Sequence, residues 1–211
     1  MTTVKRVSRQ ERAAATRRRM LDAAYDLFCA QGFRATTMDA IADRAGVAVQ
    51  TLYFTFHTKD ALLQELHNRT VLGEEGTPPP RQEWHLAAMA EPDARRAVAI
   101  AVEGISTILQ KVAPMMPVFH TVSADAAGEV FRNGEQRRRD GYRVLADDLV
   151  TKSPLAPGMT SDRVSDLLFV LLGPETYRSF VIELGWTREQ WTDWTTSALV
   201  RDIFGYDPVN R

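Results

Sequence analysis

The stretch at residues 36–59, TTMDAIADRAGVAVQTLYFTFHTK, constrains the fold of this chain more than any other. Apolar residues recur at helical spacing over its first part. Thr36, with Asp39 three residues later, is a plausible N-cap for that helix. Gly46 then ends the helix, because glycine adopts the left-handed backbone conformation that a helix end needs.

A second short helix is predicted at about residues 49–56, with Leu52 and Phe56 on its inner side. Its other side chains face outward or to the flanks. Two short helices joined by a tight glycine turn form a helix-turn-helix unit, whose second helix fits the major groove of DNA.

The surrounding motif also carries a family resemblance. The run AGVAVQTLYFTFHTKDALL, at residues 45–63, combines a turn glycine, Thr-Leu-Tyr, an aromatic pair, and Lys-Asp before two leucines. Upstream, DLFCAQGFRATT, at residues 26–37, matches the pattern ALFxxxGFxxTT at every specified position except the first. Over roughly residues 16–66 the chain therefore resembles the tetracycline-repressor (TetR) family of bacterial transcription regulators. Gln50 departs from the pattern, since many members have glycine there.

The resemblance implies an all-α fold of about nine helices in two domains. The N-terminal three-helix DNA-binding domain is expected at residues 1–72, with a basic arm at 1–15 and the helix-turn-helix at 36–56. The linker GEEGTPPPRQ, at residues 73–82, contains three consecutive prolines that cannot continue a helix. A helical effector-binding and dimerisation domain is expected at residues 73–211.

Charge is distributed unevenly along the chain, although the net charge is only −1. The first 70 residues carry eleven Lys or Arg against seven Asp or Glu, and the remainder carries fifteen against twenty. A basic N-terminal part fits the binding of a polyanion by that part. The arm residues Lys5, Arg6, Arg9 and Arg12 either contact phosphate or the minor groove, or form a solvated tail.

Other features bear on location and chemistry. No run reaches the ~18 apolar residues that span a membrane, and no apolar h-region follows the basic N-terminus. The single cysteine, Cys29, is expected to be a small buried hydrophobe in a reducing cytoplasm.

Phosphate contacts are expected from four hydroxyls and one cation. The hydroxyl groups belong to Thr37, Thr51, Tyr53 and Thr55, and the cation is Lys59, which resembles the family's phosphate-contacting lysine. Base reading is assigned to Val49, Gln50 and Tyr53, since Gln can pair with adenine and Val can touch a thymine methyl.

The C-terminal part reads as helices separated by prolines and loops. Pro92 is predicted at the first position of a helix that reaches residue 112. A later helix is expected to kink or break near Gly173-Pro174, and Thr187 with Gln190 predicts a capping box for the final helix. The arginine run at 137–139 is interpreted as a solvated helix face, as are the adjacent carboxylates of Asp147 and Asp148.

The last two helices are richer in Leu and Trp than one small body must bury. The resemblance places a homodimer interface here, and exposed apolar patches usually mark interfaces. The expected interface residues are Leu168, Leu171, Leu172, Trp191, Trp194 and Leu199.

The helical body also holds residues suited to an effector pocket for a small, largely apolar or aromatic molecule. These residues are Met89, Met115, Phe119, His120, Phe131, Tyr142, Phe169 and Tyr177. His120 is the preferred polar candidate. Each of these residue types is more often plain core than pocket.

These observations predict a dimeric DNA-binding regulator in the cytoplasm. It would repress from a palindromic operator and be released by a small effector. One alternative is a regulator without a small-molecule ligand, controlled by a protein partner. A remote alternative is an all-helical enzyme with a helix-turn-helix head. No cofactor or metal is predicted, because the four histidines show no metal-ligand spacing, and no catalytic or phosphate-loop motif is present.

Overall fold

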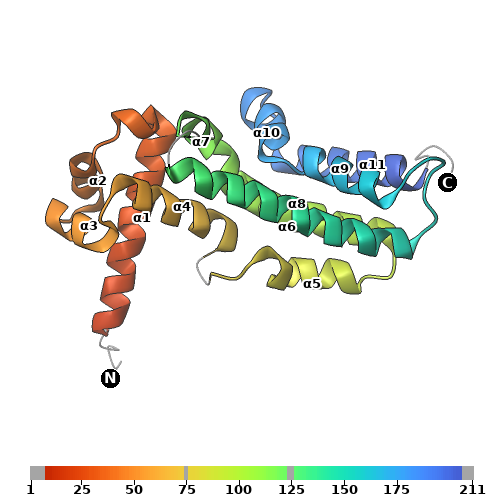
Figure 1. The fold of residues 1–211 in the computed structure, drawn as a ribbon, viewed down its shortest axis with the longest axis horizontal. Coiled ribbons are helices and arrows are strands. Elements are labelled where there is room, and N and C mark those ends of the chain that lie inside the picture. The colour runs from red at the N-terminus through yellow and green to blue at the C-terminus, as the bar shows by residue number, and fades with distance from the viewer. Residues whose placement is uncertain (1–7, 74–75, 123–125, 206–211) are drawn as a thin grey trace, which may run out of the picture. The chain divides into compact units, whose positions relative to one another are not determined.

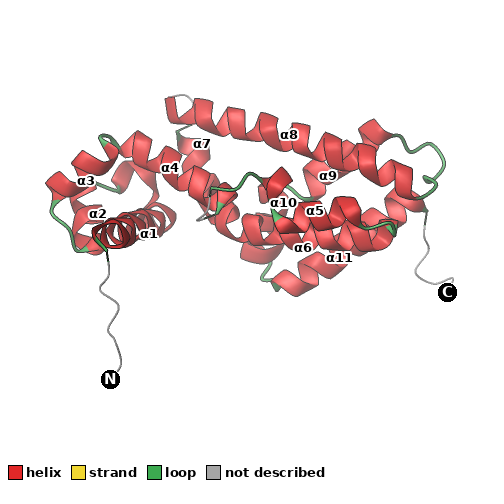
Figure 2. Ribbon diagram, turned by 90° about the horizontal axis from the view of Figure 1, so that it is seen from below, coloured by secondary structure: helices red, strands yellow, loops and turns green. Residues whose placement is uncertain are grey.

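The computed structural model describes residues 8–73, 76–122 and 126–205, and every regular element in these ranges is helical (Figures 1 and 2). The predicted all-α fold is confirmed. The chain divides into two compact units. We call Met1–His67 with Pro117–Glu129 the head, and Asn68–Met116 with Val130–Arg211 the body.

The head begins with the long helix α1 (Arg9–Ala35) (Figure 1). Ser8 and Glu11 form a capping box at its start, so residues 9–15 are helical and the prediction of an arm at 1–15 is wrong for them. Lys5 and Arg6 lie outside the described residues. Gly32, with φ 82° and ψ 168°, interrupts the helix near its end.

Three further helices complete the N-terminal part: α2 (Met38–Ala45), α3 (Val49–Phe56) and α4 (Lys59–Leu72). The α2 helix packs on α1 and on α3. Their apolar faces form a core whose buried members include Met20, Leu21, Phe28, Ile41, Leu52, Phe56, Leu62, Leu63 and Leu66. The short helix α7 (Met116–Thr121) contributes Phe119, whose ring meets His67 edge-on at 4.9 Å between centroids. Burial of these side chains fixes the positions of α2 and α3.

The body contains α5 (Glu83–Ala90), α6 (Ala94–Val112), α8 (Ala126–Lys152), α9 (Ser161–Leu171), α10 (Pro174–Tyr177) and α11 (Arg188–Phe204). Two 3₁₀ turns, η1 (Pro79–Arg81) and η2 (Ala113–Met115), precede α5 and follow α6. The buried face of α6 is central, because both α5 and α11 pack on it. The α11 helix also contacts α9.

The α5 and α6 helices approach closely at a glycine. A Cβ atom placed on Gly104 would lie 2.2 Å from Cγ of Trp84, so only glycine fits there. The α6 helix starts at Asp93, whose side chain accepts a hydrogen bond from Arg96 N at 2.9 Å. The prediction that Pro92 occupies the first helical position is therefore wrong, because Asp93 supplies the cap one residue later.

The predicted break near Gly173-Pro174 is confirmed. The α9 helix ends at Leu171, and α10 begins at Pro174, which has no N–H to continue the earlier helix. A π-helical turn, η3 (Arg178–Glu183), follows. The predicted capping box of Thr187 and Gln190 at the start of α11 is also confirmed.

One helical stretch, Ala94–Thr121, is long and apolar enough by composition to cross a membrane. Just over half of its most apolar window, 56%, is buried inside the protein. The core position of α6 therefore accounts for this hydropathy.

Two charged groups of α8 are less solvated than the sequence predicts. The Arg138 guanidinium lies 3.7 Å from the Phe169 ring centroid and donates to the Phe169 carbonyl at 2.7 Å. Asp148 is half-buried and pairs with Lys152 at 3.0 Å. The interpretation of both as solvated surface charges is wrong, because the body packs against them. Asp147 is exposed as predicted.

Candidate nucleic-acid interface

The turn between α2 and α3 has the predicted glycine, but α2 has a different cap. The Thr37 hydroxyl accepts a hydrogen bond from Ala40 N at 3.1 Å and so caps α2. Thr36, the predicted cap, is instead buried, and its hydroxyl donates to the Gly32 carbonyl at 2.8 Å. Gly46 ends α2 in the left-handed conformation with φ 66°, as predicted.

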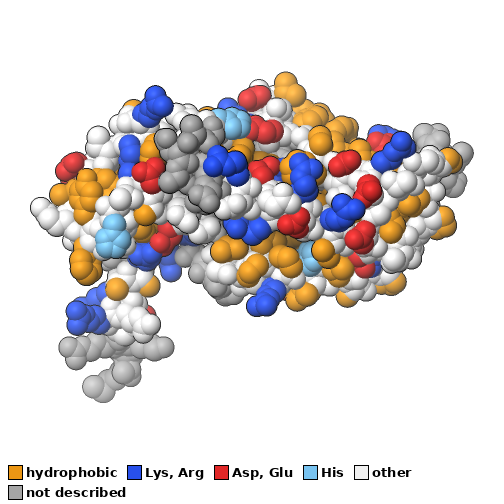
Figure 3. Space-filling view, in the orientation of Figure 1, with side chains coloured by type: hydrophobic (Ala, Val, Ile, Leu, Met, Phe, Trp, Pro, Cys, Tyr) orange, Lys and Arg blue, Asp and Glu red, His pale blue; other side chains and the backbone are white. Residues whose placement is uncertain are grey.

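The α3 helix presents a polar and aromatic outer face. Leu52 and Phe56 are buried as predicted, while Gln50 and Thr51 are exposed and Val49 is half-buried. Tyr53 is 47% exposed. In a space-filling view, hydrophobic side chains reach the surface over the region of α2 and α3 (Figure 3). This face is available to a DNA groove.

Phe54 is the residue of this face that sequence reasoning missed. Its side chain is 84% exposed, although it is wholly apolar. The sequence held a signal for it. Phe54 follows Gln50 by four residues, so both must lie on the side opposite the buried Leu52.

The Thr55 hydroxyl does not suit the phosphate contact predicted for it. Its Oγ1 donates to the Thr51 carbonyl at 2.7 Å. Phosphate oxygens accept hydrogen bonds, and a hydroxyl has one O–H to donate. In this structure the donor of Thr55 is therefore engaged within α3. The Thr37 hydroxyl only accepts in its capping bond, which leaves its O–H for a phosphate.

Lys59 is bonded within the head. Its Nζ donates to the backbone carbonyls of Phe33 and Thr36, each at 2.8 Å. The ammonium also lies 4.3 Å from the Phe33 ring centroid. Lys59 therefore fastens the start of α4 to the junction of α1 and α2. A phosphate could share only the third N–H of this ammonium.

The α3–α4 junction is a sharp turn. His57 has φ 63°, which is unusual for a residue with a side chain, and its N–H donates to the Tyr53 carbonyl at 2.8 Å. Thr58 then caps α4 by accepting a hydrogen bond from Ala61 N at 3.0 Å. The turn thus fixes where α3 ends.

Ion pairs stabilise the head behind this face. Arg17 forms a two-pronged ion pair with Glu65, and its guanidinium lies 4.7 Å from the Phe56 ring centroid. Arg44 pairs with Asp26 at 2.7 Å. These contacts join α4 to α1 and α2 to α1, so they stabilise the arrangement of the helices that position α3.

Cys29 is exposed on α1, so the prediction that it is a buried hydrophobe is wrong. Partial desolvation raises the pKa of the Cys29 thiol, and the hydrogen bond from Tyr25 opposes this effect. Desolvation likewise raises the pKa of the Tyr25 phenol. The thiol is therefore protonated near neutral pH and poorly suited to nucleophilic chemistry.

The eight residues expected around an effector differ in how deeply they are buried. Met115, Phe119, Tyr142 and Tyr177 are core residues, and Met89, Phe131 and Phe169 are half-buried. His120 is exposed, so the structure does not enclose it as the polar group of a pocket. The Tyr142 hydroxyl donates to the Leu172 carbonyl at 2.8 Å, and burial raises the pKa of Tyr142 to about 12.

Tyr177 differs from the other seven. Its hydroxyl is buried and, within the described part of the chain, has no hydrogen-bond partner. The same holds for Nε1 of Trp191, whose ring meets that of Tyr177 edge-on at 4.8 Å between centroids, and for Oγ1 of Thr195. Buried polar atoms are normally satisfied, so three in one region mark a place where a polar group could be accommodated.

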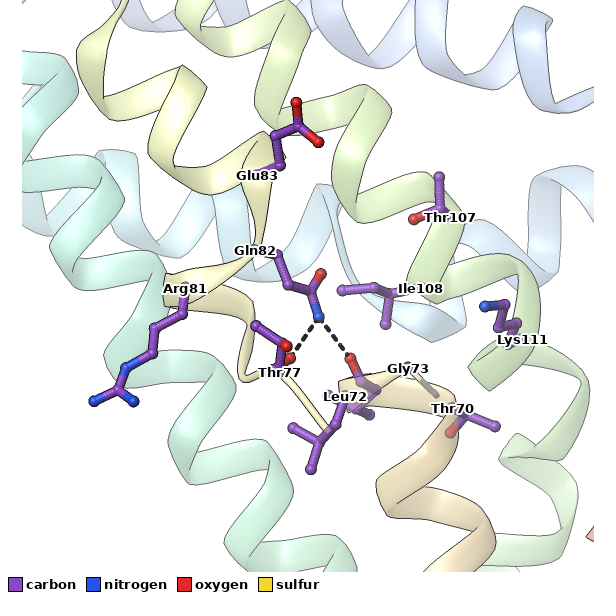
Figure 4. Close-up of a pocket in the computed structure, with 11 residues that line it drawn as sticks. Thr70, Leu72, Gly73, Thr77, Arg81, Gln82, Glu83, Thr107, Ile108 and Lys111 are labelled. Atoms are coloured by element: carbon purple, nitrogen blue, oxygen red, sulfur yellow. Dashed lines mark hydrogen bonds between the residues drawn. The ribbon is translucent and has the colours of Figure 1, made fainter. Parts of the chain in front are cut away.

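A surface pocket of about 390 Å³ lies in the body between the end of α4, the start of α5 and α6 (Figure 4). Gln82 lies in its centre, and its side-chain amide donates to the carbonyls of Thr77 at 2.8 Å and Val71 at 3.2 Å. Arg81 and Lys111 lie on opposite sides (Figure 4). The lining contains none of the eight predicted effector residues.

The expected dimer residues divide into two groups. Leu168, Leu172, Trp191 and Leu199 are buried in the chain's own core, so the interface prediction is wrong for these four side chains. Leu171 is half-buried, and Trp194 is 38% exposed within a cluster of aromatic rings with Phe180 and Trp186. Val170, at 59%, is also exposed.

Within residues 8–73, 76–122 and 126–205, no group of three or more His, Cys, Asp or Glu side chains could hold a metal ion.

Lys152, Asp148 and His85 form a group of charged and titratable side chains in the body. Lys152 donates to the Met89 carbonyl at 2.8 Å while it pairs with Asp148, and His85 lies near enough to feel the Asp148 charge. Burial lowers the pKa of His85, and Asp148 partly offsets this effect.

Comparisons with known proteins fit this geometry. Residues 20–66 match the family model described as bacterial regulatory proteins, tetR family. No curated protein sequence matches the chain.

Several solved structures share the fold. A TetR-like transcriptional regulator from Rhodococcus sp. RHA1 is 24% identical, with 93% of this chain and 97% of that chain covered and a TM-score of 0.59. NalD, the secondary repressor of the MexAB-OprM multidrug efflux pump in Pseudomonas aeruginosa, is 19% identical, with 90% and 96% covered and a TM-score of 0.63. A transcriptional regulator from Saccharomonospora viridis, in complex with choline, is 17% identical, with 89% and 96% covered and a TM-score of 0.68.

The all-helical chain, with its helix-turn-helix in the head, thus has the fold of solved transcriptional regulators. More closely, residues 20–66 are similar to the bacterial regulatory proteins of the tetR family, and the chain as a whole shares its fold with solved TetR-family regulators.

Proposed function

We propose that this protein binds an approximately palindromic operator as a homodimer and represses transcription in the cytoplasm. The observation that carries the proposal is the exposed outer face of α3, which the turn at Gly46 and the buried Leu52 and Phe56 hold outward. In a two-fold dimer, two such helices enter successive major grooves about one helical turn apart.

In this proposal, some side chains of the head contact DNA phosphates and position the protein, and others contact bases and select the sequence. Thr37, Thr51 and Tyr53 are the proposed phosphate contacts, with Lys59 as a partial one. Gln50 and Val49 are the proposed base readers, since phosphate contacts set register and base contacts select sequence.

Selection of bound sequences from random duplex DNA, with purified protein at fixed salt, tests the proposal. We expect a palindrome with half-sites separated by about one helical turn. Recovery of no motif, with only salt-sensitive background binding, would contradict an operator-reading function.

We further propose that a small molecule releases the protein from DNA. Supporting observations are the choline complex of the Saccharomonospora viridis neighbour and the unpartnered polar atoms of Tyr177 and Trp191. A ligand lowers operator affinity only if it prefers the non-binding state.

The alternative hypothesis is that a protein partner, without a small-molecule ligand, controls DNA binding. A thermal-shift screen, followed by release from the selected operator, separates them. A ligand that raises Tm and releases DNA supports the effector, and a screen without one favours the partner.

A further inference from the structure

The α3 helix carries an exposed phenylalanine that its packing does not explain. Phe54, 84% exposed, is the most exposed large apolar side chain of the described residues. Leu52 and Phe56 already fill the inner face of α3. Phe54 therefore contributes little to the core of the head.

Phe54 and Gln50 together form the outermost part of α3. An α-helix turns about 100° per residue, so each lies about 160° from Leu52, on opposite sides of the line that points away from the core. Residues four apart on a helix have Cβ atoms about 5–6 Å apart. Gln50 is exposed as well, so the two side chains present one surface.

The composition of α3 restricts which bases this surface can read. Arg and Lys are the usual partners of guanine, and Asp and Glu are the usual partners of cytosine. The helix sequence, VQTLYFTF, contains none of the four. The Thr55 hydroxyl is engaged by the Thr51 carbonyl. What remains at the outermost line is an amide, which suits adenine, and an apolar ring, which suits a thymine methyl.

We propose that Phe54 reads a thymine methyl group in the major groove, beside an adenine paired with Gln50, so that the centre of α3 selects A·T base pairs. The inference rests on the proposed operator binding. Base pairs rise 3.4 Å along one strand, and the two Cβ atoms are about 5–6 Å apart. The thymine therefore lies one or two base pairs from the adenine.

The test uses duplexes that carry the half-site recovered by selection, with each thymine replaced in turn by deoxyuridine, which lacks only the methyl group. At one position, deoxyuridine should weaken wild-type binding about fourfold, the factor associated with burying one methylene-sized apolar group. Phe54→Ala should bind thymine and deoxyuridine equally there and keep its discrimination elsewhere. Phe54→Leu should retain part of the effect.

Two controls accompany these variants. Gln50→Ala should keep the thymine-to-deoxyuridine ratio and lose the preference for the neighbouring adenine. Thermal unfolding of Phe54→Ala should match wild type, because the side chain is exposed.

The possible results separate this inference from the operator proposal. If wild type is insensitive to the methyl group at every position, or if Phe54→Ala keeps the wild-type ratio, the role of Phe54 is overturned while operator binding stands. Uniform weakening of Phe54→Ala on all duplexes, with the ratio unchanged, would place Phe54 against the sugar-phosphate backbone and also overturn it. If selection yields no motif, both proposals fail.

Discussion

At the scale of single residues, the ammonium of Lys59 stabilises the part of the head that positions α3. It joins the first residue of α4 to the carbonyls of Phe33 and Thr36, between α1 and α2. Hydrogen bonds from a charged donor are stronger than neutral ones. Loss of this group should loosen the support behind α3.

We therefore expect Lys59→Ala to lower the free energy of unfolding by about 2 kcal/mol, because charged hydrogen bonds contribute roughly 1.5–3 kcal/mol each and water partly replaces them. Chemical denaturation measures the change. The exposed Arg34, substituted by Ala, is the matched control and should change stability by less than about 0.5 kcal/mol. Unchanged stability in Lys59→Ala, with a weaker salt dependence of DNA binding, would instead mean that Lys59 serves only phosphate.

At the scale of elements, the α5–α6 contact depends on the absence of a side chain at Gly104. The Trp84 side chain occupies the space that a Cβ atom on Gly104 would need. The indole Nε1 of Trp84 donates a hydrogen bond to Gln82 Oε1 at 2.7 Å. The indole is therefore fixed by its contact with Gly104 and by this hydrogen bond. Close packing of this kind leaves little room for adjustment.

Gly104→Ala should lower the free energy of unfolding by about 1–3 kcal/mol, as overpacked cores do. Gly141, also inside a helix, has nothing within 4 Å of its missing Cβ. Gly141→Ala should therefore raise the free energy by about 0.5–1 kcal/mol, because alanine favours the helix. Denaturation curves of the two variants provide the comparison, and equal effects would refute the argument from Trp84.

His85 on α5 makes the stability of the body depend on pH. Burial lowers its pKa below the ordinary value near 6.5, so the unfolded chain binds its proton more readily than the folded chain. Its contribution to stability is present above pH 6.5 and falls as the pH drops from there through the folded pKa. His85→Gln should flatten the change in the free energy of unfolding between pH 7.5 and 5.5.

The matched control for that measurement is a histidine substitution at an exposed position, His57→Asn. A parallel pH dependence in wild type and His85→Gln would show that other groups are responsible.

At the scale of the whole molecule, the proposed dimer needs an apolar surface outside the chain's own core. Val170 on α9 and Trp194 on α11 provide exposed apolar side chains on two helices that contact each other. The buried Trp191 and Leu199 hold α11 in place from within. We therefore propose that these two exposed side chains lie in the dimer interface.

The double substitution Val170→Glu and Trp194→Glu should convert the dimer to a monomer, because burying two unpaired carboxylates is costly. Analytical ultracentrifugation measures the mass. Val144→Glu, at a residue 53% exposed on α8, is the matched control and should remain dimeric. A dimer that survives the double substitution would place the interface elsewhere.

The sequence by itself determined most of the local elements, because helices, caps and turns depend on neighbours in the chain. Gly46, the Thr187 capping box and the break at Pro174 are where the sequence predicts them, whereas α2 and α6 are capped by Thr37 and Asp93 instead of the predicted residues. The motif at residues 45–63 likewise indicated the class of protein. The spacing of its residues depends only on the turn at Gly46 and on the short helix α3, both of which are local in sequence.

Only the tertiary structure decided what each side chain touches. The partners of Lys59 lie 23 and 26 residues away in sequence, and Arg138 meets Phe169 from 31 residues away. The interface prediction was wrong for Trp191 for the same reason. Helical spacing identifies Trp191 and Trp194 equally as apolar residues, without showing which of them the chain itself buries. Packing buries the first in the core and leaves the second exposed. Periodicity identifies an apolar residue, but only the assembled helices determine whether the chain itself covers it.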